Sequence, residues 1–82
     1  IRMTKTFNIG EYAVGGRIKV TLSKSVLQIQ ALDWATRSVV RQQTFQVDRD
    51  QGMTDATWFL EDLSTSYYAD QIMTFVKSKM NS

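Results

Sequence analysis

The chain has 82 residues and a formal net charge of +2, and it contains no histidine, no cysteine and no proline. A chain of this length forms one domain with a modest core. Without histidine and cysteine it lacks the commonest general acid–base residue near neutral pH, a thiolate nucleophile and the soft metal ligands. We therefore expect no enzymatic activity, no cofactor and no bound metal.

We expect the single domain to span residues 3–82, and we interpret Ile1 and Arg2 as an addition that precedes a native start at Met3. No run of about 18 apolar residues is present, so no segment is predicted to cross a membrane. The N-terminus lacks the charged segment and the apolar stretch of a signal peptide. The expected location is therefore the cytoplasm.

The charges are distributed unevenly along the chain. From Met3 to Val47 there are six basic and two acidic residues, whereas from Asp48 to Ser82 there are three basic and six acidic residues. This asymmetry indicates an anionic partner for the first half. It is equally consistent with attraction between the two halves, within one molecule or between subunits.

Four segments of the first half have the apolar–polar alternation of strands with one face in water. The clearest is residues 17–23, in which Ile18, Val20 and Leu22 alternate with charged or hydroxylated residues. The predicted strands are residues 6–14, 17–23, 26–32 and 37–47. Together they predict an antiparallel meander.

Short polar segments separate these strands. Gly15 and Gly16 predict a two-residue hairpin turn, because glycine accepts the positive φ angles that such turns require. Residues 23–25 predict the next turn, and residues 33–36 predict a four-residue connection. Residues 48–52 predict a polar turn that ends the sheet.

The fourth strand contains a conflict of phase. Phe45 and Val47 have the same parity as Arg41, whereas Val40 has the other parity. A β-bulge near residues 41–43 would place Val40 on the buried face with Phe45 and Val47. We therefore predict a bulge at that point.

The second half changes to helical spacing. Thr54 is the predicted N-cap of a helix. The apolar stripe that contains Leu63 is out of phase with the stripe that contains Ile72, and hydroxyl residues lie between them. We therefore predict two helices, over residues 54–63 and 66–80. The alternative is one long helix that buries opposite faces at its two ends and requires a second subunit.

These elements predict an α+β fold, in which a four-stranded antiparallel meander is covered on one face by C-terminal helical structure. The core should lie between the sheet and the helices. The predicted core residues are Ile18, Val20, Leu22, Leu27, Ile29, Phe45, Leu63, Ile72, Phe75 and Val76.

The acidic residues form no convincing site. Asp48, Asp50 and Gly52 have a weak similarity to a calcium loop, but no glutamate stands at the twelfth position. Glu61 and Asp62 are adjacent on a predicted helix and point about 100° apart, so they cannot converge as a catalytic pair. We interpret these carboxylates as solvated surface charges.

The basic candidates lie in the predicted sheet. Arg17 and Lys19 alternate with buried residues, and Arg41 and Tyr12 are predicted to share their face, together with several glutamines. Cations combined with an exposed aromatic ring are typical of sheets that bind single-stranded nucleic acid. The alternative interpretation is the solvated side of an ordinary strand.

The large rings indicate a second kind of surface. Trp34 lies in a polar connection, where it either folds back over the edge of the core or contacts a partner. The helical segments carry more apolar residues than one face of a four-stranded sheet needs, which favours a homodimer or a larger oligomer. The predicted protein-interface residues are Trp34, Trp58, Tyr67 and Met73.

The order of four strands followed by helical structure resembles that of the Pur-type and Whirly-type single-strand nucleic-acid binders. That resemblance implies dimers that display a basic sheet face. The stretch IKVTLSKSVLQIQ is also similar to part of a pleckstrin-homology-like sheet, although such a domain has more strands. Both resemblances concern topology alone, so neither transfers the role of any residue.

The sequence therefore predicts a non-catalytic interaction module, homo-oligomeric and acting through protein–protein contacts. The alternative is single-stranded nucleic-acid binding through the basic face of the sheet. A small enzyme is the third hypothesis, and the missing histidine and cysteine argue against it.

Overall fold

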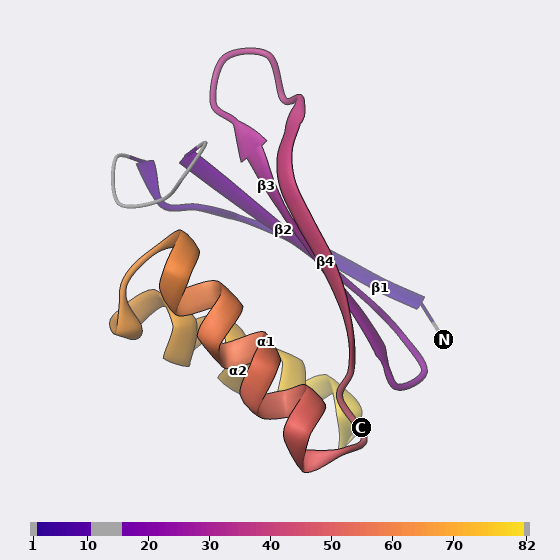
Figure 1. The fold of residues 1–82 in the computed structure, drawn as a ribbon. Helices are drawn as coiled ribbons and strands as arrows, with labels where there is room; N and C mark the ends of the chain where they lie inside the picture. Colours follow the sequence, from indigo (N-terminus) through magenta and orange to yellow (C-terminus); the bar gives the residue numbers. More distant parts are fainter. Residues whose placement is uncertain (1, 11–15, 82) are drawn as a thin grey trace.

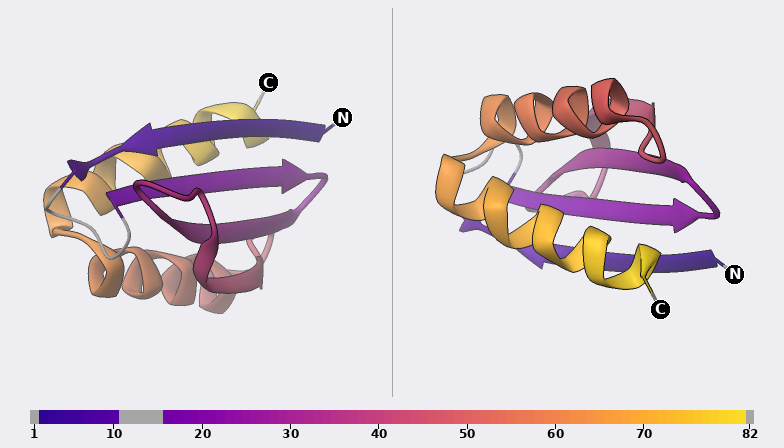
Figure 2. Two further views of the ribbon diagram at one scale, coloured as in Figure 1. Left: turned by 90° about the horizontal axis from the view of Figure 1, so that it is seen from above. Right: turned by 90° about the horizontal axis from the view of Figure 1, so that it is seen from below.

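The computed structural model describes residues 2–10 and 16–81, and it consists of one antiparallel sheet and two helices (Figure 1). The sheet has the order β1-β2-β3-β4, so each strand pairs with its neighbour in the sequence. Both helices cover the same face of the sheet (Figure 2). The predicted α+β meander is therefore confirmed. The elements are β1 (Arg2–Asn8), β2 (Gly16–Ser23), β3 (Val26–Asp33), β4 (Val39–Gln46), α1 (Asp50–Leu63) and α2 (Ser66–Met80).

The two central strands follow the predicted alternation. Ile18 pairs with Ala31 and Val20 pairs with Ile29, and all four side chains are buried against the helices. Opposite residues of an antiparallel pair point to the same face, so the intervening positions of both strands point away from the helices. Burying a valine or isoleucine side chain stabilises the fold by about 1.5–3 kcal/mol. The central strands thus fix which face of the sheet is covered.

The first strand lies earlier in the chain than predicted. β1 ends at Asn8, and Arg2 pairs with Ser23, so Arg2 belongs to the folded sheet. Of the predicted two-residue turn, Gly15 lies outside the described residues, and Gly16 is not a turn residue because it begins β2 and pairs with Asp33. The predicted strand residues 11–14 lie outside the described part of the chain.

The irregularity of β4 is real, but it lies at a different residue. The pairing with β3 is continuous from Phe45 to Arg41, and the register shifts between Ala31 and Leu32, opposite Val40. Val40 therefore stays 47% exposed, and the predicted bulge at residues 41–43 is wrong. Because Arg41 pairs with Ala31, its side chain lies on the face of the sheet that the helices cover.

The predicted break between the helices is confirmed. α1 ends at Leu63, and Thr65 is the N-cap of α2, where its hydroxyl accepts a hydrogen bond from the backbone N–H of Tyr68 at 3.4 Å. The break rotates the second apolar stripe onto the sheet, so the single long helix is excluded. α1 begins at Asp50, which places Thr54 inside the helix and makes the predicted N-cap wrong.

The core occupies the space between the sheet and the two helices. All the predicted core residues are buried except Phe75, which is partly buried. Its ring makes an edge-to-face contact with Phe7 of β1, with the ring centroids 5.7 Å apart. The side-chain nitrogen of Lys5 lies 4.8 Å from the centroid of the Phe75 ring. The helix layer therefore reaches the edge strand β1.

Candidate functional site

The outer face is the surface of the sheet that points away from the helices, and it is uncovered (Figure 2, left). Pairing across the four strands places hydroxyl, amide and basic side chains on it, and its described residues include no aspartate or glutamate. These residues are Arg2, Thr4, Thr6, Asn8, Arg17, Lys19, Thr21, Ser23, Val26, Gln28, Gln30, Leu32, Val39, Gln42, Thr44 and Gln46. The face is therefore polar and positively charged.

One end of the outer face is hollowed into a depression of about 610 Å³. Three of the residues that line it are cationic, two carry amides, two are apolar and one is a threonine. No described carboxylate lies within 4.0 Å of a cationic nitrogen of Arg17, Lys19 or Arg37. The depression therefore concentrates positive charge that has no internal counterion among the described residues. Its lining residues are Thr6, Asn8, Arg17, Lys19, Gln30, Leu32, Arg37 and Val39.

Arg17 is held by an aromatic ring. The central carbon of its guanidinium lies 4.4 Å from the ring centroid of Trp34, and the Trp34 side chain remains 53% exposed. A cation–π contact at such a site contributes about 0.5–1 kcal/mol and restricts the arginine. The Nε of Arg17 is buried and has no hydrogen-bond partner among the described residues. The Arg17 guanidinium is thus held by Trp34 and forms no ion pair with a described carboxylate.

Trp34 reaches this position because Gly16 has no side chain. A Cβ atom at Gly16 would lie 3.1 Å from the Cβ of Trp34, closer than an ordinary contact. Gly16 also has a φ of 87°, which favours glycine. Trp34 therefore folds back over the beginning of β2 and still presents much of its ring to solvent.

The connection that carries Trp34 is organised by Asp33. The Asp33 carboxylate accepts hydrogen bonds from the backbone N–H groups of Ala35 (3.0 Å) and Thr36 (2.9 Å) and from the Thr36 hydroxyl (3.1 Å). The bonds from Thr36 and Ala35 favour the charged form and lower the pKa of Asp33, although partial desolvation opposes them. Arg37, near the end of the connection, has a φ of 64°. This chain path brings Arg37 to the depression.

Replacing Asp33 by asparagine is expected to remove a pH-dependent part of the stability. The folded pKa of Asp33 is lowered, so its contribution is present above the unfolded pKa of about 3.8 and is lost as the pH falls through the folded value. Urea unfolding at pH 7 and at pH 3 measures the effect. The wild type should exceed Asp33→Asn in stability at pH 7, and the difference should shrink at pH 3. A difference that is constant with pH would contradict this role.

The structure separates the predicted basic residues. Arg17 and Lys19 lie together in the depression, whereas Arg41 lies on the covered face and is a wrong prediction for this site. The Arg41 guanidinium lies 5.0 Å from the ring centroid of Phe59 and forms an ion pair with Asp62 at 3.3 Å. Tyr12 lies outside the described residues.

Sequence reasoning missed several residues of the depression. Arg37 appeared only as a strand residue, because its position depends on a positive φ and on the register shift opposite Val40. Thr6 and Asn8 were assigned to a strand over residues 6–14, whereas β1 spans Arg2–Asn8 and its pairing was not predicted. The alternation of residues in β1 indicates that Thr6 and Asn8 share one face. Their position beside Lys19 and Arg17 follows only from the observed pairing of β1 with β2.

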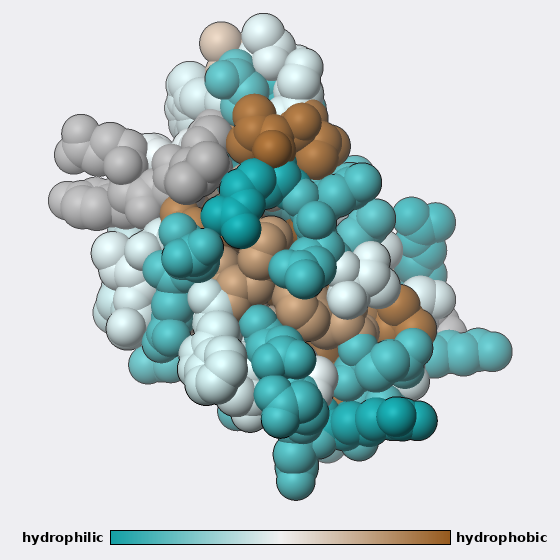
Figure 3. All heavy atoms as spheres, in the orientation of Figure 1, coloured by the Kyte–Doolittle hydropathy of each residue, from teal (hydrophilic) through white to brown (hydrophobic). Residues whose placement is uncertain are grey.

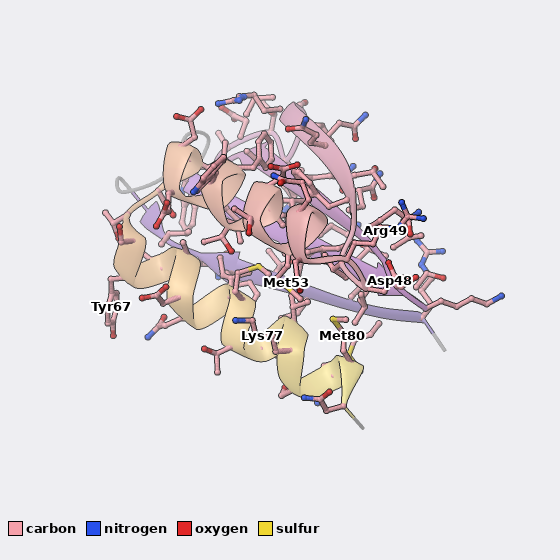
Figure 4. All side chains as sticks on the ribbon, turned by 60° about the horizontal axis from the view of Figure 1, so that its bottom comes forward. Asp48, Arg49, Met53, Tyr67, Lys77 and Met80 are labelled. Atoms are coloured by element: carbon pink, nitrogen blue, oxygen red, sulfur yellow. The ribbon has the colours of Figure 1, made fainter. Side chains whose placement is uncertain are left out.

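The predicted protein-interface residues have different positions. Met73 is 3% exposed and belongs to the core, so its assignment to a surface is wrong. Trp58 is 62% exposed on α1 and Tyr67 is 65% exposed on α2. Tyr67 projects from the beginning of α2 (Figure 4), and its hydroxyl accepts a hydrogen bond from the Gln71 amide at 2.9 Å.

A second hollow lies between β4 and α1, with a volume of about 520 Å³. Trp58 borders it, and so do Asp55 and the Arg41–Asp62 ion pair. α1 contains no basic residue, in contrast to the outer face of the sheet. Its acidic residues are Asp50, Asp55, Glu61 and Asp62. The charge asymmetry of the sequence thus becomes an acidic helix on one layer and a basic depression on the other.

A hydrophobic patch lies over the beginning of β4 (Figure 3). Val39 and Val40 are each 47% exposed there. β4 is an edge strand of the sheet, so the backbone groups on its side away from β3 have no neighbouring strand. The patch therefore lies beside an unpaired edge.

The described part of the chain contains no cluster of three or more acidic residues arranged to hold a metal ion. Neither described helix is long and apolar enough to span a membrane. In comparisons of this chain with protein-family models, curated proteins and solved structures, nothing matches. The functional argument therefore rests on the depression and its surroundings.

Proposed function

We propose that the protein is a non-catalytic module that binds single-stranded nucleic acid along the outer face of its sheet. The observation that carries this proposal is the convergence of Arg17, Lys19 and Arg37 in the depression, where Arg17 also contacts the ring of the exposed Trp34. Cations in this arrangement contact phosphates, and an exposed indole stacks on a base. Four acidic residues that would repel a polyanion lie on the opposite layer, in α1. The Asp33 carboxylate, which is near the depression, is already engaged by hydrogen bonds from Ala35 and Thr36.

A single strand suits this surface better than a duplex. Stacking on Trp34 requires a base whose face is free, and a duplex keeps that face covered. The amides and hydroxyls that surround the cations are donors for phosphate and sugar oxygens, and such contacts position a strand without reading its sequence. Gln30 is already oriented, because its amide donates a hydrogen bond to Gln42 at 2.9 Å. We therefore expect binding with little sequence preference.

Fluorescence anisotropy with labelled oligo-dT, titrated at salt concentrations between 50 and 200 mM, tests the proposal. If three cations contact phosphates, the slope of log affinity against log salt should be about −2. Affinity should then fall ~10- to 20-fold over this range. A duplex of the same length should bind more weakly. Absence of binding at 50 mM salt would contradict the proposal.

A second candidate is self-association through the edge of β4. Val39, Val40 and Trp58 are exposed, and they lie on or beside the unpaired edge. A second copy that pairs with this edge would cover the patch. Light scattering should then give twice the chain mass of 9.4 kDa, and Val40→Lys should reduce it to the monomer. A monomeric wild type at millimolar concentration would exclude this candidate.

A further inference from the structure

We propose that the depression binds a phosphate monoester at the end of a nucleic-acid strand. This inference rests on the proposed function and specifies which part of the strand occupies the depression. It starts from the uneven distribution of charge on the outer face. Arg17 and Lys19 lie in adjacent rows at one end of the sheet, and the next row across the strands is neutral. That neutral row consists of Thr4, Thr21, Gln28 and Thr44.

The charge of the depression exceeds what one internal phosphate requires. An internal phosphodiester carries one negative charge, whereas a phosphate monoester carries about −1.5 to −2 near pH 7 and offers three acceptor oxygens. Arg17, Lys19 and Arg37 line the depression, and no described carboxylate lies within 4.0 Å of their cationic nitrogens. The amides of Asn8 and Gln30 provide further donors. The site therefore matches a compact group of higher charge.

The geometry of Arg17 agrees with this ligand. A guanidinium presents its N–H groups as a rigid fork that matches two phosphate oxygens. Trp34 lies 4.4 Å from the guanidinium carbon and limits the positions that the fork can take. Trp34 is 53% exposed as a residue, and a terminal base that stacked on its exposed part would lie near the phosphate that Arg17 binds. Phosphate and base would thus be bound at neighbouring points.

The chain between β3 and β4 lies at this end of the outer face. It projects away from the helix layer (Figure 1). Two backbone hydrogen bonds brace it, from the N–H of Asp33 to the carbonyl of Ser38 at 2.8 Å and from the N–H of Arg37 to the carbonyl of Asp33 at 2.9 Å. A strand that runs along the outer face meets this braced connection at the depression. An end of the strand fits such a position better than a continuous strand does.

The experiment compares three internally labelled dT hexamers, which carry a 5′-phosphate, a 3′-phosphate or hydroxyls at both ends. We expect one phosphorylated form to bind ~5-fold more tightly than the hydroxyl form at 0.1 M salt, because one further charge is neutralised. The two phosphorylated forms distinguish which end is bound. A short strand is required because internal phosphates of a long strand would outnumber the end.

Two variants of Arg37 keep the test independent of folding. Arg37→Gly removes the charge and suits the φ of 64°, so it should abolish the preference for the phosphorylated hexamer. Arg37→Lys retains a charge and should restore part of the preference. Equal binding of all three hexamers would overturn this inference and leave the proposed function standing. If oligo-dT also fails to bind at 50 mM salt, the proposed function fails as well.

Discussion

Replacing Gly52 by alanine is expected to destabilise the fold by about 3 kcal/mol or more, in the range of the most damaging single substitutions. Gly52 lies in the first turn of α1, where the helix passes directly over the end of β4. A Cβ atom at this position would overlap the backbone carbonyl of Gln46. Backbone atoms cannot move aside as a flexible side chain can, so α1 would have to shift away from the sheet.

Helix propensity alone gives the opposite sign for this substitution. Alanine is about 1 kcal/mol more favourable than glycine inside a helix, so an unobstructed position would be stabilised. Urea unfolding of Gly52→Ala therefore distinguishes the contact with Gln46 from propensity. A variant as stable as the wild type would contradict the observed placement of α1 on β4.

Thr54→Ala is the matched control for Gly52→Ala. Thr54 is exposed and lies inside α1, so the control should leave the stability unchanged or raise it by up to about 0.7 kcal/mol. If Thr54 were instead the N-cap of the helix, the same substitution would cost about 1 kcal/mol. The pair of variants thus tests both where α1 begins and how closely it approaches the sheet.

Removing the three cations of the depression is expected to weaken binding to oligo-dT about 100-fold at 0.1 M salt. Each phosphate contact on a single strand contributes about 5-fold under these conditions. The variant combines Arg17→Ala, Lys19→Ala and Arg37→Gly, and its salt dependence should flatten because fewer counterions are released. Anisotropy measured across the salt series gives both the affinity and the slope.

A control with the same net charge separates local contacts from the overall field of the protein. Lys24→Gly, Arg49→Ala and Lys77→Ala together remove three positive charges at exposed positions that do not line the depression. Lys24 has a φ of 57°, so glycine suits it. The control should retain most of the affinity. Equal loss in both triple variants would show that only the net charge matters and would contradict a site in the depression.

The sequence predicted the parts of the fold in which one local pattern decides the outcome. Ile18, Val20 and Leu22 alternate without interruption, and a shift of one residue would expose all of them. The break between the helices was predictable for the same reason, because the stripes that contain Leu63 and Ile72 cannot both face one sheet on a straight helix.

The parts that escaped prediction depend on contacts between distant segments. The apolar residues of β4 did not show which of its side chains face the helices. Arg41 lies on the covered face, at a position where alternation predicts a core residue. Its place becomes favourable only because Phe59 and Asp62 of α1 lie beside it. The position of Arg37 similarly depends on the register shift in β4 and on its own left-handed backbone conformation. The candidate site was therefore only partly predictable, through Arg17 and Lys19, whereas Trp34 was predicted for a protein interface and not for this site.

The central claim is that nucleic acid binds at the outer face of the sheet. Chemical shifts of the backbone amides and of the indole N–H groups, recorded while oligo-dT is added at low salt, test it most directly. We expect the largest changes at Lys19 and Gln30 on the outer face and at the indole N–H of Trp34, whereas the indole of Trp58 on α1 should not respond. The two tryptophans thus report separately on the two layers. Changes confined to Trp58 and the helices, or no changes at all, would contradict binding at the outer face of the sheet.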